Sequence, residues 1–392
     1  MMKSSEYYCK MWCGWSFIYP PRGMKRVGDR SVEERFARLL AEVFRQFLKM
    51  CQRASRKVLW LLPAMFAATA PYLYAQAHPR MYYEDTSRIG VSFAKDPSVA
   101  RFHGSYFLYY SLPSRRVQNT TTMGGAFLPG WGIGIAQSKD MIHWTKVGEL
   151  QAASEIEKDG VAAPKAHVIG GRLHLFFQTY GHGPKDAICH AWSDDGVHFT
   201  DDPSNPIFRP TKMPWSVGRA IDGEVFQGGK KLYLYFATRD PEMRRQSIGM
   251  AESDDPFGFE AGHWRDVSIT EPILKPELGW EGECVEAPSV IKRGRKYYMF
   301  YAGSYNGVKQ QIGVAVSPDG RNWRRLSDEP LMRIGKPGTW NSTESGHPGV
   351  LQIGRRTYMF FQGSNDDGKS YVLSMVEIGW RDGLPYVKED RP

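Results

Sequence analysis

Three acidic residues stand in similar short motifs that lie far apart along the chain. They occur in Lys95-Asp96-Pro97, Ile221-Asp222-Gly223 and Glu286-Ala287-Pro288. Two carboxyl groups can perform general acid–base catalysis when one is protonated and the other ionised. A third negative charge nearby raises the pKa of the group that must keep its proton. Asp96, Asp222 and Glu286 are therefore candidate catalytic residues, provided that the fold brings them together.

A repeat of about sixty residues indicates how that happens. Five times a Ser is followed six residues later by a large aromatic residue, and these Ser residues are Ser138, Ser193, Ser253, Ser317 and Ser374. The first four copies also carry Asp two residues after the Ser, at Asp140, Asp195, Asp255 and Asp319. Ser and Asp side chains bond nearby backbone N–H groups and shape tight turns. We therefore predict a structural role for these four acids.

Upstream of each such pair lies a Gly-containing turn followed by an aromatic-rich stretch, as in 104–110 and 294–301. Short β-rich runs separated by turn residues predict antiparallel strands. Five units of this length predict an all-β fold, a five-bladed β-propeller of four-stranded antiparallel blades, over residues 78–392.

In a propeller, the start of each blade's innermost strand faces the central channel. The three acids fall in this slot of blades one, three and four, while 162–165 and 346–350 fill it in blades two and five. Four of the five segments contain Pro, which suits the first residues of a strand. Ringed around one axis, the three carboxylates would converge.

These motifs, in this order, resemble the five-bladed glycosidases of glycoside hydrolase family 43 over roughly residues 85–380. The resemblance implies that Asp96 is the general base, Glu286 the general acid and Asp222 the residue that tunes the pKa of the acid. Cleavage of a glycosidic bond needs one carboxylic acid and one carboxylate, which agrees with these roles. Gly223 and Ala287 depart from the family's commoner residues, and the motifs of the related fructan-cleaving families are missing. We therefore predict an inverting hydrolase of poly- or oligosaccharides.

His347 occupies the blade-five slot. The resemblance implies a bound cation, commonly calcium, near such a His, whereas a packed channel His is the plainer alternative. Calcium prefers oxygen ligands, so a His would act mainly through water. Glu224, two residues after Asp222, is expected to share the face of Asp222 and to support it.

Other functions remain as alternatives. A carbohydrate-binding propeller without catalysis would keep the fold, and a related propeller family would retain rather than invert configuration. The Ser-x-Asp turns also suggest a sialidase, but that fold has six blades. The repeat signatures of WD and kelch scaffolds are absent.

Almost all of the formal net charge of +9 lies in the N-terminal part of the chain. Residues 1–77 hold 13 Lys/Arg against 5 Asp/Glu, whereas residues 78–392 hold 38 against 37. The nearly neutral body argues against a nucleic-acid partner. We expect a carbohydrate substrate from plant or algal polysaccharide, and a monomer or small homo-oligomer.

A secretory signal peptide is predicted over residues 50–77, because Arg53, Arg56 and Lys57 precede a short apolar run that ends in an Ala-Gln-Ala motif. The run is too short for stable membrane insertion. Residues 1–49 are interpreted as a non-native, disordered or helical extension outside the fold. A periplasmic or secreted protein is expected, with Cys189 and Cys284 as two buried thiols rather than a disulfide framework.

Overall fold

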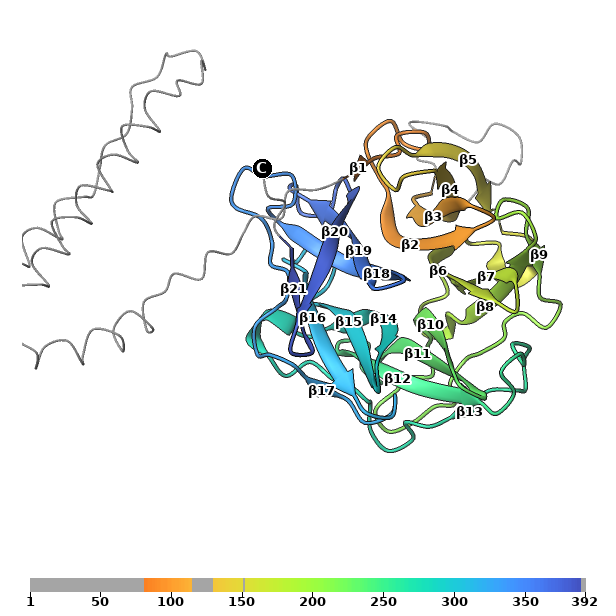
Figure 1. Cartoon of the computed structure of the whole chain (residues 1–392). Coiled ribbons are helices and arrows are strands. Elements are labelled where there is room, and N and C mark those ends of the chain that lie inside the picture. The colour runs from red at the N-terminus through yellow and green to blue at the C-terminus, as the bar shows by residue number, and fades with distance from the viewer. Residues whose placement is uncertain (1–80, 115–129, 151, 389–392) are drawn as a thin grey trace, which may run out of the picture. The chain divides into compact units, whose positions relative to one another are not determined.

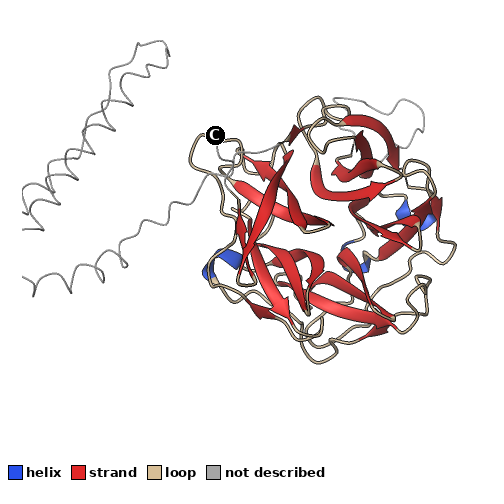
Figure 2. Cartoon of the chain, viewed as in Figure 1, coloured by secondary structure: helices blue, strands red, loops and turns tan. Residues whose placement is uncertain are grey.

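Five antiparallel sheets are arranged in a ring around one axis in the computed structural model, which describes residues 81–114, 130–150 and 152–388 (Figure 1). Regular structure in this part of the chain is almost entirely strand (Figure 2). The short exceptions are the 3₁₀ turns η1 (Glu155–Glu157), η2 (Gly183–Lys185) and η3 (Gly279–Glu281). The predicted five-bladed, all-β propeller is thereby confirmed.

Each of the first four blades is a meander of four strands that follow one another in the sequence. Blade one contains β2 (Lys95–Phe102), β3 (Ser105–Leu112), β4 (Gly132–Ser138) and β5 (Thr145–Leu150). Blade two contains β6 (Val161–Ile169), β7 (Arg172–Thr179), β8 (Ile188–Ser193) and β9 (Thr200–Asp201). Blade three contains β10 (Ile221–Gly228), β11 (Lys231–Arg239), β12 (Gln246–Ser253) and β13 (Arg265–Asp266). Blade four contains β14 (Val285–Arg293), β15 (Lys296–Gly303), β16 (Gln311–Ser317) and β17 (Arg324–Arg325).

Blade five is completed by both ends of the described chain. Its strands β18 (Glu344–Ile353), β19 (Arg356–Ser364) and β20 (Val372–Arg381) follow the common pattern. The outer edge of β20 then pairs with two short strands, β1 (Tyr82–Tyr83) and β21 (Leu384–Val387). Because β1 precedes blade one in the sequence, its pairing with β20 closes the ring.

The hydrophobic core is divided among the five interfaces between neighbouring blades. On β3, Phe107 and Tyr109 belong to the cluster shared with blade two, whereas Leu108 and Tyr110 belong to the cluster shared with blade five. Successive side chains of a strand point to opposite faces of the sheet, and both faces of each blade are covered. This explains why the second strands read as continuous aromatic and aliphatic runs.

The Ser-x-Asp pairs shape turns, as predicted. In blade one, Oδ1 of Asp140 accepts N–H bonds from Ile142 and His143, at 2.8 Å each. The same pattern recurs at Asp195 and Asp319, and Asp255 accepts one such bond. The fifth copy was misread, because Ser374 lies within β20 and donates to the carbonyl of Met81.

Further sequence predictions concern the cysteines, membrane insertion and the N-terminal segments. The two thiols, Cys189 and Cys284, are unpaired and buried, as expected. Among the described residues, no helix is long and apolar enough to cross a bilayer. The extension predicted over 1–49 and the signal peptide predicted over 50–77 lie outside the described residues.

Candidate active site

A β-bulge near the start of every innermost strand positions the site. The pairing register shifts there in β2, β6, β10, β14 and β18. One residue of each bulge has a φ between +47° and +55°, and these residues are Asp96, Ala163, Asp222, Ala287 and His347. Such a residue interrupts the alternation of the strand and re-aims the side chains beside it. In blade four this residue is Ala287, and Glu286 precedes it. Glu286 therefore stands one position earlier in its strand than Asp96 and Asp222 do in theirs.

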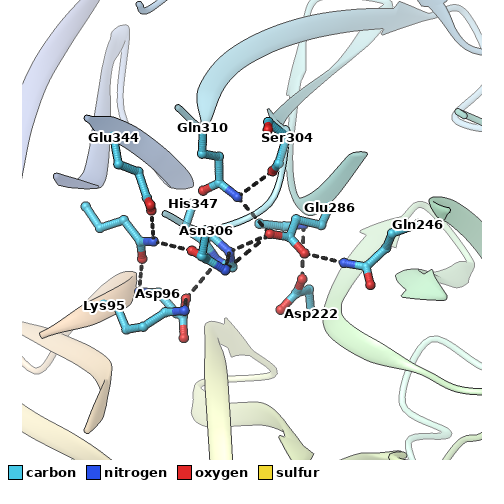
Figure 3. A network of polar contacts seen from close by, with 12 residues as sticks. Lys95, Asp96, Asp222, Gln246, Glu286, Ser304, Asn306, Gln310, Glu344 and His347 are labelled. Carbon is cyan, nitrogen blue, oxygen red and sulfur yellow. Dashed lines mark hydrogen bonds and ion pairs between the residues drawn. The ribbon is translucent and has the colours of Figure 1, made fainter. Parts of the chain in front are cut away.

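The three predicted acids and His347 nevertheless converge at one end of the channel (Figure 3). His347 contacts Oδ1 of Asp96 through Nδ1 at 2.8 Å and Oε1 of Glu286 through Nε2 at 3.1 Å. One donor atom each from Asp222, Glu286 and His347 lies within 4.8 Å of the other two. All four side chains are buried, and all line one cavity of about 310 Å³.

Asp96 is arranged as an ionised acceptor. Its Oδ1 lies 3.4 Å from Nζ of Lys95 and 2.8 Å from Nδ1 of His347, so two cations face the same oxygen. Burial favours the neutral acid, but the charges of Lys95 and His347 outweigh burial and hold the pKa of Asp96 well below its usual range. A buried carboxylate that two cations hold in its ionised form can take a proton from water.

Glu286 is surrounded by donors. Oε1 accepts from Nε2 of Gln310 at 2.7 Å and from Nδ2 of Asn306 at 3.4 Å, while Oε2 accepts from Nε2 of Gln246. Donors that point at a carboxylate favour its charged form. Burial opposes this effect, but the contact with His347 and the charge of Lys95 add to it, so the pKa of Glu286 is lowered.

Asp222 has the opposite tendency. Among the described residues, its side chain accepts one hydrogen bond, from the backbone N–H of Ala287 at 3.3 Å. Burial raises the pKa of Asp222 to about 6, and the charges of Glu286 and Asp96 add to the shift against the opposition of His347. Burial thus favours the protonated form of Asp222, whereas the sequence led us to expect the raised pKa at Glu286. Neighbouring acids titrate as a pair, so the protonation of Asp222 and that of Glu286 are linked.

His347 is held as a cation by its neighbours. Burial would lower the pKa of the ring, but Asp96 and Glu286 raise it to about 10. Both ring nitrogens are engaged, and an imidazolium cannot ligate a metal. His347, Asp222 and Glu286 therefore fit a directly bound calcium ion poorly, since calcium prefers a cage of oxygens. A calcium ion bound through water near the axis remains a prediction.

Three other acids near Asp222 and Glu286 in the sequence, Glu224, Glu281 and Glu283, lie outside this site. Glu224 does not share the face of Asp222: it contacts His167 at 3.3 Å, accepts from the backbone of Val290 and lines a second cavity of about 410 Å³. Glu281 is paired with Arg325, and Glu283 is exposed beside Arg245. The bulge explains the error for Glu224, because it breaks the two-residue alternation between Asp222 and Glu224.

Aromatic residues form part of the cavity wall. Trp131 and Tyr180 have ring centroids 4.9 Å apart, and Tyr305 lines the cavity as well. The residues Trp131, Trp215, Trp280 and Trp340 all lie outside the named strands, and among these Trp131 alone lines the cavity. Trp215, Trp280 and Trp340 instead cover glycines of their own blades.

Sequence reasoning missed the polar residues that hold the acids. Gln246, Asn306, Gln310 and Gln362 were not identified, although Gln362 accepts the N–H of Asp96 at 2.8 Å and donates to Asn306 at 2.7 Å. Lys95 was quoted within its motif but given no role. The repeat did carry a signal for three of them. Gln362 follows Phe-Phe in β19 as Gln178 does in β7, and Gln246 and Gln310 both stand two residues before an Ile-Gly pair. Asn306 lies in a loop and has no such repeated neighbour.

Comparison with known proteins decides the family. The family model described as glycosyl hydrolases family 43 matches residues 87–385. The chain belongs to this family. A solved thermostable family-43 glycoside hydrolase superposes with a TM-score of 0.60 at 19% identity, covering 79% of this chain and 96% of that one.

Two curated relatives differ in the activity that their names state. A 1,2-beta-oligomannan phosphorylase of Thermoanaerobacter sp. (strain X514) is 28% identical over 57% of this chain and 67% of its own length. A xylosidase/arabinosidase of Bacteroides ovatus is 24% identical over 41% of this chain and 51% of its own length. This family-43 chain thus resembles enzymes that cleave with water and enzymes that cleave with phosphate.

Proposed function

We propose that this family-43 protein hydrolyses glycosidic bonds of oligo- or polysaccharides with inversion of configuration. Asp96 takes a proton from water, whose oxygen bonds to the anomeric carbon. The bond to the leaving oxygen breaks on the opposite face, and Glu286, whose protonation is linked to that of Asp222, gives that oxygen a proton. The observation that carries the proposal is the convergence of three buried acids from three blades on one sugar-sized cavity.

The arrangement around His347 supports inversion. Asp96 and Glu286 contact different nitrogens of the same ring, so the width of an imidazole lies between them. The ring therefore keeps the two carboxyls apart, as inversion requires, because pairs about 6.5–9.5 Å apart invert whereas pairs about 5–5.5 Å apart retain. The signal peptide predicted over residues 50–77 further supports action on glycans outside the cytoplasm.

The test is hydrolysis by the purified protein of a panel of aryl-glycosides and oligosaccharides, with the first anomer of the product identified by NMR. Glu286→Gln should lower kcat/KM by about 10²- to 10⁴-fold, because it removes general acid catalysis. Glu283→Gln is the matched control, since Glu283 is exposed three residues away. Full activity of Glu286→Gln would refute the assignment, and glycan binding without turnover on any substrate would favour the non-catalytic alternative.

Phosphorolysis is a second candidate, supported by the similarity to the oligomannan phosphorylase and by the cationic residues Lys95, Arg219 and Arg239 in the cavity wall. In that reaction a phosphate oxygen attacks the anomeric carbon in place of water. The two reactions differ in their products. Adding inorganic phosphate to the assay would yield a sugar 1-phosphate in one case and leave the free sugar unchanged in the other.

A further inference from the structure

Three residues at the edge of blade three line the active-site cavity, and the acid–base mechanism as proposed gives the two arginines among them no part. Arg219 precedes β10 by two residues, Arg239 ends β11, and Gln246 begins β12 opposite Arg239. All three side chains line the same cavity as Glu286. Strand pairing thus places two guanidinium groups and one amide beside the acid.

The amide of Gln246 is oriented by the two arginines. Its Oε1 accepts from Nε of Arg239 at 3.1 Å and from Nη1 of Arg219 at 3.4 Å. Guanidinium groups donate only, so the carbonyl end of the amide must face them. The NH₂ end then points at Oε2 of Glu286 (Figure 3). The arginines therefore lie on the Glu286 side of the cavity, separated from the acid by one amide.

The two arginines differ in how their charge is balanced. Arg219 is buried and paired with Asp186, with Nη2 3.0 Å from Oδ2. Arg239 donates from Nη1 to the carbonyl of Met243 at 3.2 Å, and its guanidinium lies 5.0 Å from the ring centroid of Tyr305. Within the described ranges, no carboxylate comes within 4.0 Å of Arg239 to form an ion pair.

These contacts hold the guanidinium of Arg239 in place and leave its Nη2 edge without a partner among the described residues. A fixed guanidinium fork matches the geometry of carboxylates, sulfates and phosphates, which it can bind with two parallel hydrogen bonds. A neutral sugar gives a cation no such balancing charge. The cavity therefore carries a cationic wall that the cleavage of a neutral glycan does not require.

We propose that Arg239, supported by Arg219 and Gln246, forms an oxyanion subsite on the Glu286 side of the cavity. Its ligand is an anionic group carried by the glycan, such as the carboxylate of a uronic acid. The assignment to the glycan rests on the proposed function. In that mechanism the nucleophile enters on the side of Asp96, so a phosphate nucleophile would not lie on the Glu286 side, where Arg239 is. Free phosphate is the other source of the same chemistry, and the experiment below separates the two.

Isothermal titration calorimetry of the full chain with D-galacturonate, D-glucuronate, the neutral sugars D-galactose and D-glucose, and inorganic phosphate tests the subsite without turnover. At least one uronate should bind at least about tenfold more tightly than its neutral counterpart, because a hydrogen bond to a charged group is strong. Arg239→Gln should abolish this preference, and added NaCl should weaken it. Arg355→Gln is the matched control, since Arg355 is exposed in the hairpin between β18 and β19.

Each outcome of these titrations either supports the proposed subsite or refutes it. Phosphate binding that depends on Arg239, without uronate binding, would assign the subsite to phosphate and overturn the assignment to the glycan. Absence of any anion binding that depends on Arg239 would overturn the subsite itself. If Arg239→Gln does not fold, Arg239→Lys keeps the charge without the fork and should retain only part of the preference. Hydrolysis of neutral glycans by a protein that binds no anion would refute this subsite and leave the proposed function standing.

Discussion

At the scale of single residues, the linked protonation of Asp222 and Glu286 predicts how kcat/KM depends on pH. The acid must be protonated, so kcat/KM should fall as the pH rises through about 6, the pKa of Asp222. The base must be ionised. Because the pKa of Asp96 is lowered, kcat/KM should fall from protonation of Asp96 only at a pH far below neutrality. We expect activity to be nearly constant from mildly acidic pH up to about 6 and then to decline.

Asp222→Asn provides the check on that assignment. It removes the carboxyl with the raised pKa and leaves Glu286 with its lowered pKa. The alkaline decline of kcat/KM, measured against pH on one substrate, should therefore move to lower pH and the maximum should drop. An unchanged alkaline limb in Asp222→Asn would show that the titrating acid is another group.

Residues inside the repeat could be predicted from the sequence, whereas residues outside it could not. Asp96, Asp222 and His347 were found because each fills the same slot of a repeating unit, and the structure brings them together. Arg239 ends β11 at a place where blade two has Tyr180, so the repeat gave no signal for it, whereas Gln246 and Gln310 share a place before an Ile-Gly pair that was not compared between blades. Glu224 was misplaced because residue spacing alone does not reveal a bulge.

At the scale of the element, the backbone strain stored in the bulges can be tested at Ala163, which has a φ of +50°. Side chains pay about 1–2 kcal/mol in this left-handed region and glycine does not, so Ala163→Gly relieves strain while it loses a buried methyl group and gains freedom in the unfolded chain. These effects nearly cancel, and the free energy of unfolding should change by less than about 0.5 kcal/mol.

Ala166→Gly is the matched substitution, because Ala166 is buried in the same strand, β6, outside the bulge. It loses the methyl group without relieving strain, and should lower the free energy of unfolding by about 1–2 kcal/mol. Urea denaturation followed by tryptophan fluorescence measures both. Equal losses at the two positions would mean that the bulge stores no strain.

At the scale of the whole molecule, the ring depends on a strand of two residues. In β1, Tyr83 is buried against Tyr110, with ring centroids 5.2 Å apart and their hydroxyl groups 2.8 Å apart. Tyr82, on the opposite face, is 53% exposed. The acids come from β2, β10 and the start of β14, so their convergence requires that blades five and one stay together.

Substitution of the two tyrosines measures this closure. Tyr83→Ala should lower the free energy of unfolding by about 3–5 kcal/mol, as expected for removal of a large buried ring. Tyr82→Ala, in the same strand, should cost less than about 1 kcal/mol. Because the acids are positioned by the closed ring, Tyr83→Ala should also lower kcat at temperatures well below its unfolding midpoint. Equal losses of stability in both variants would show that the contacts between blades one and five hold the ring closed without β1.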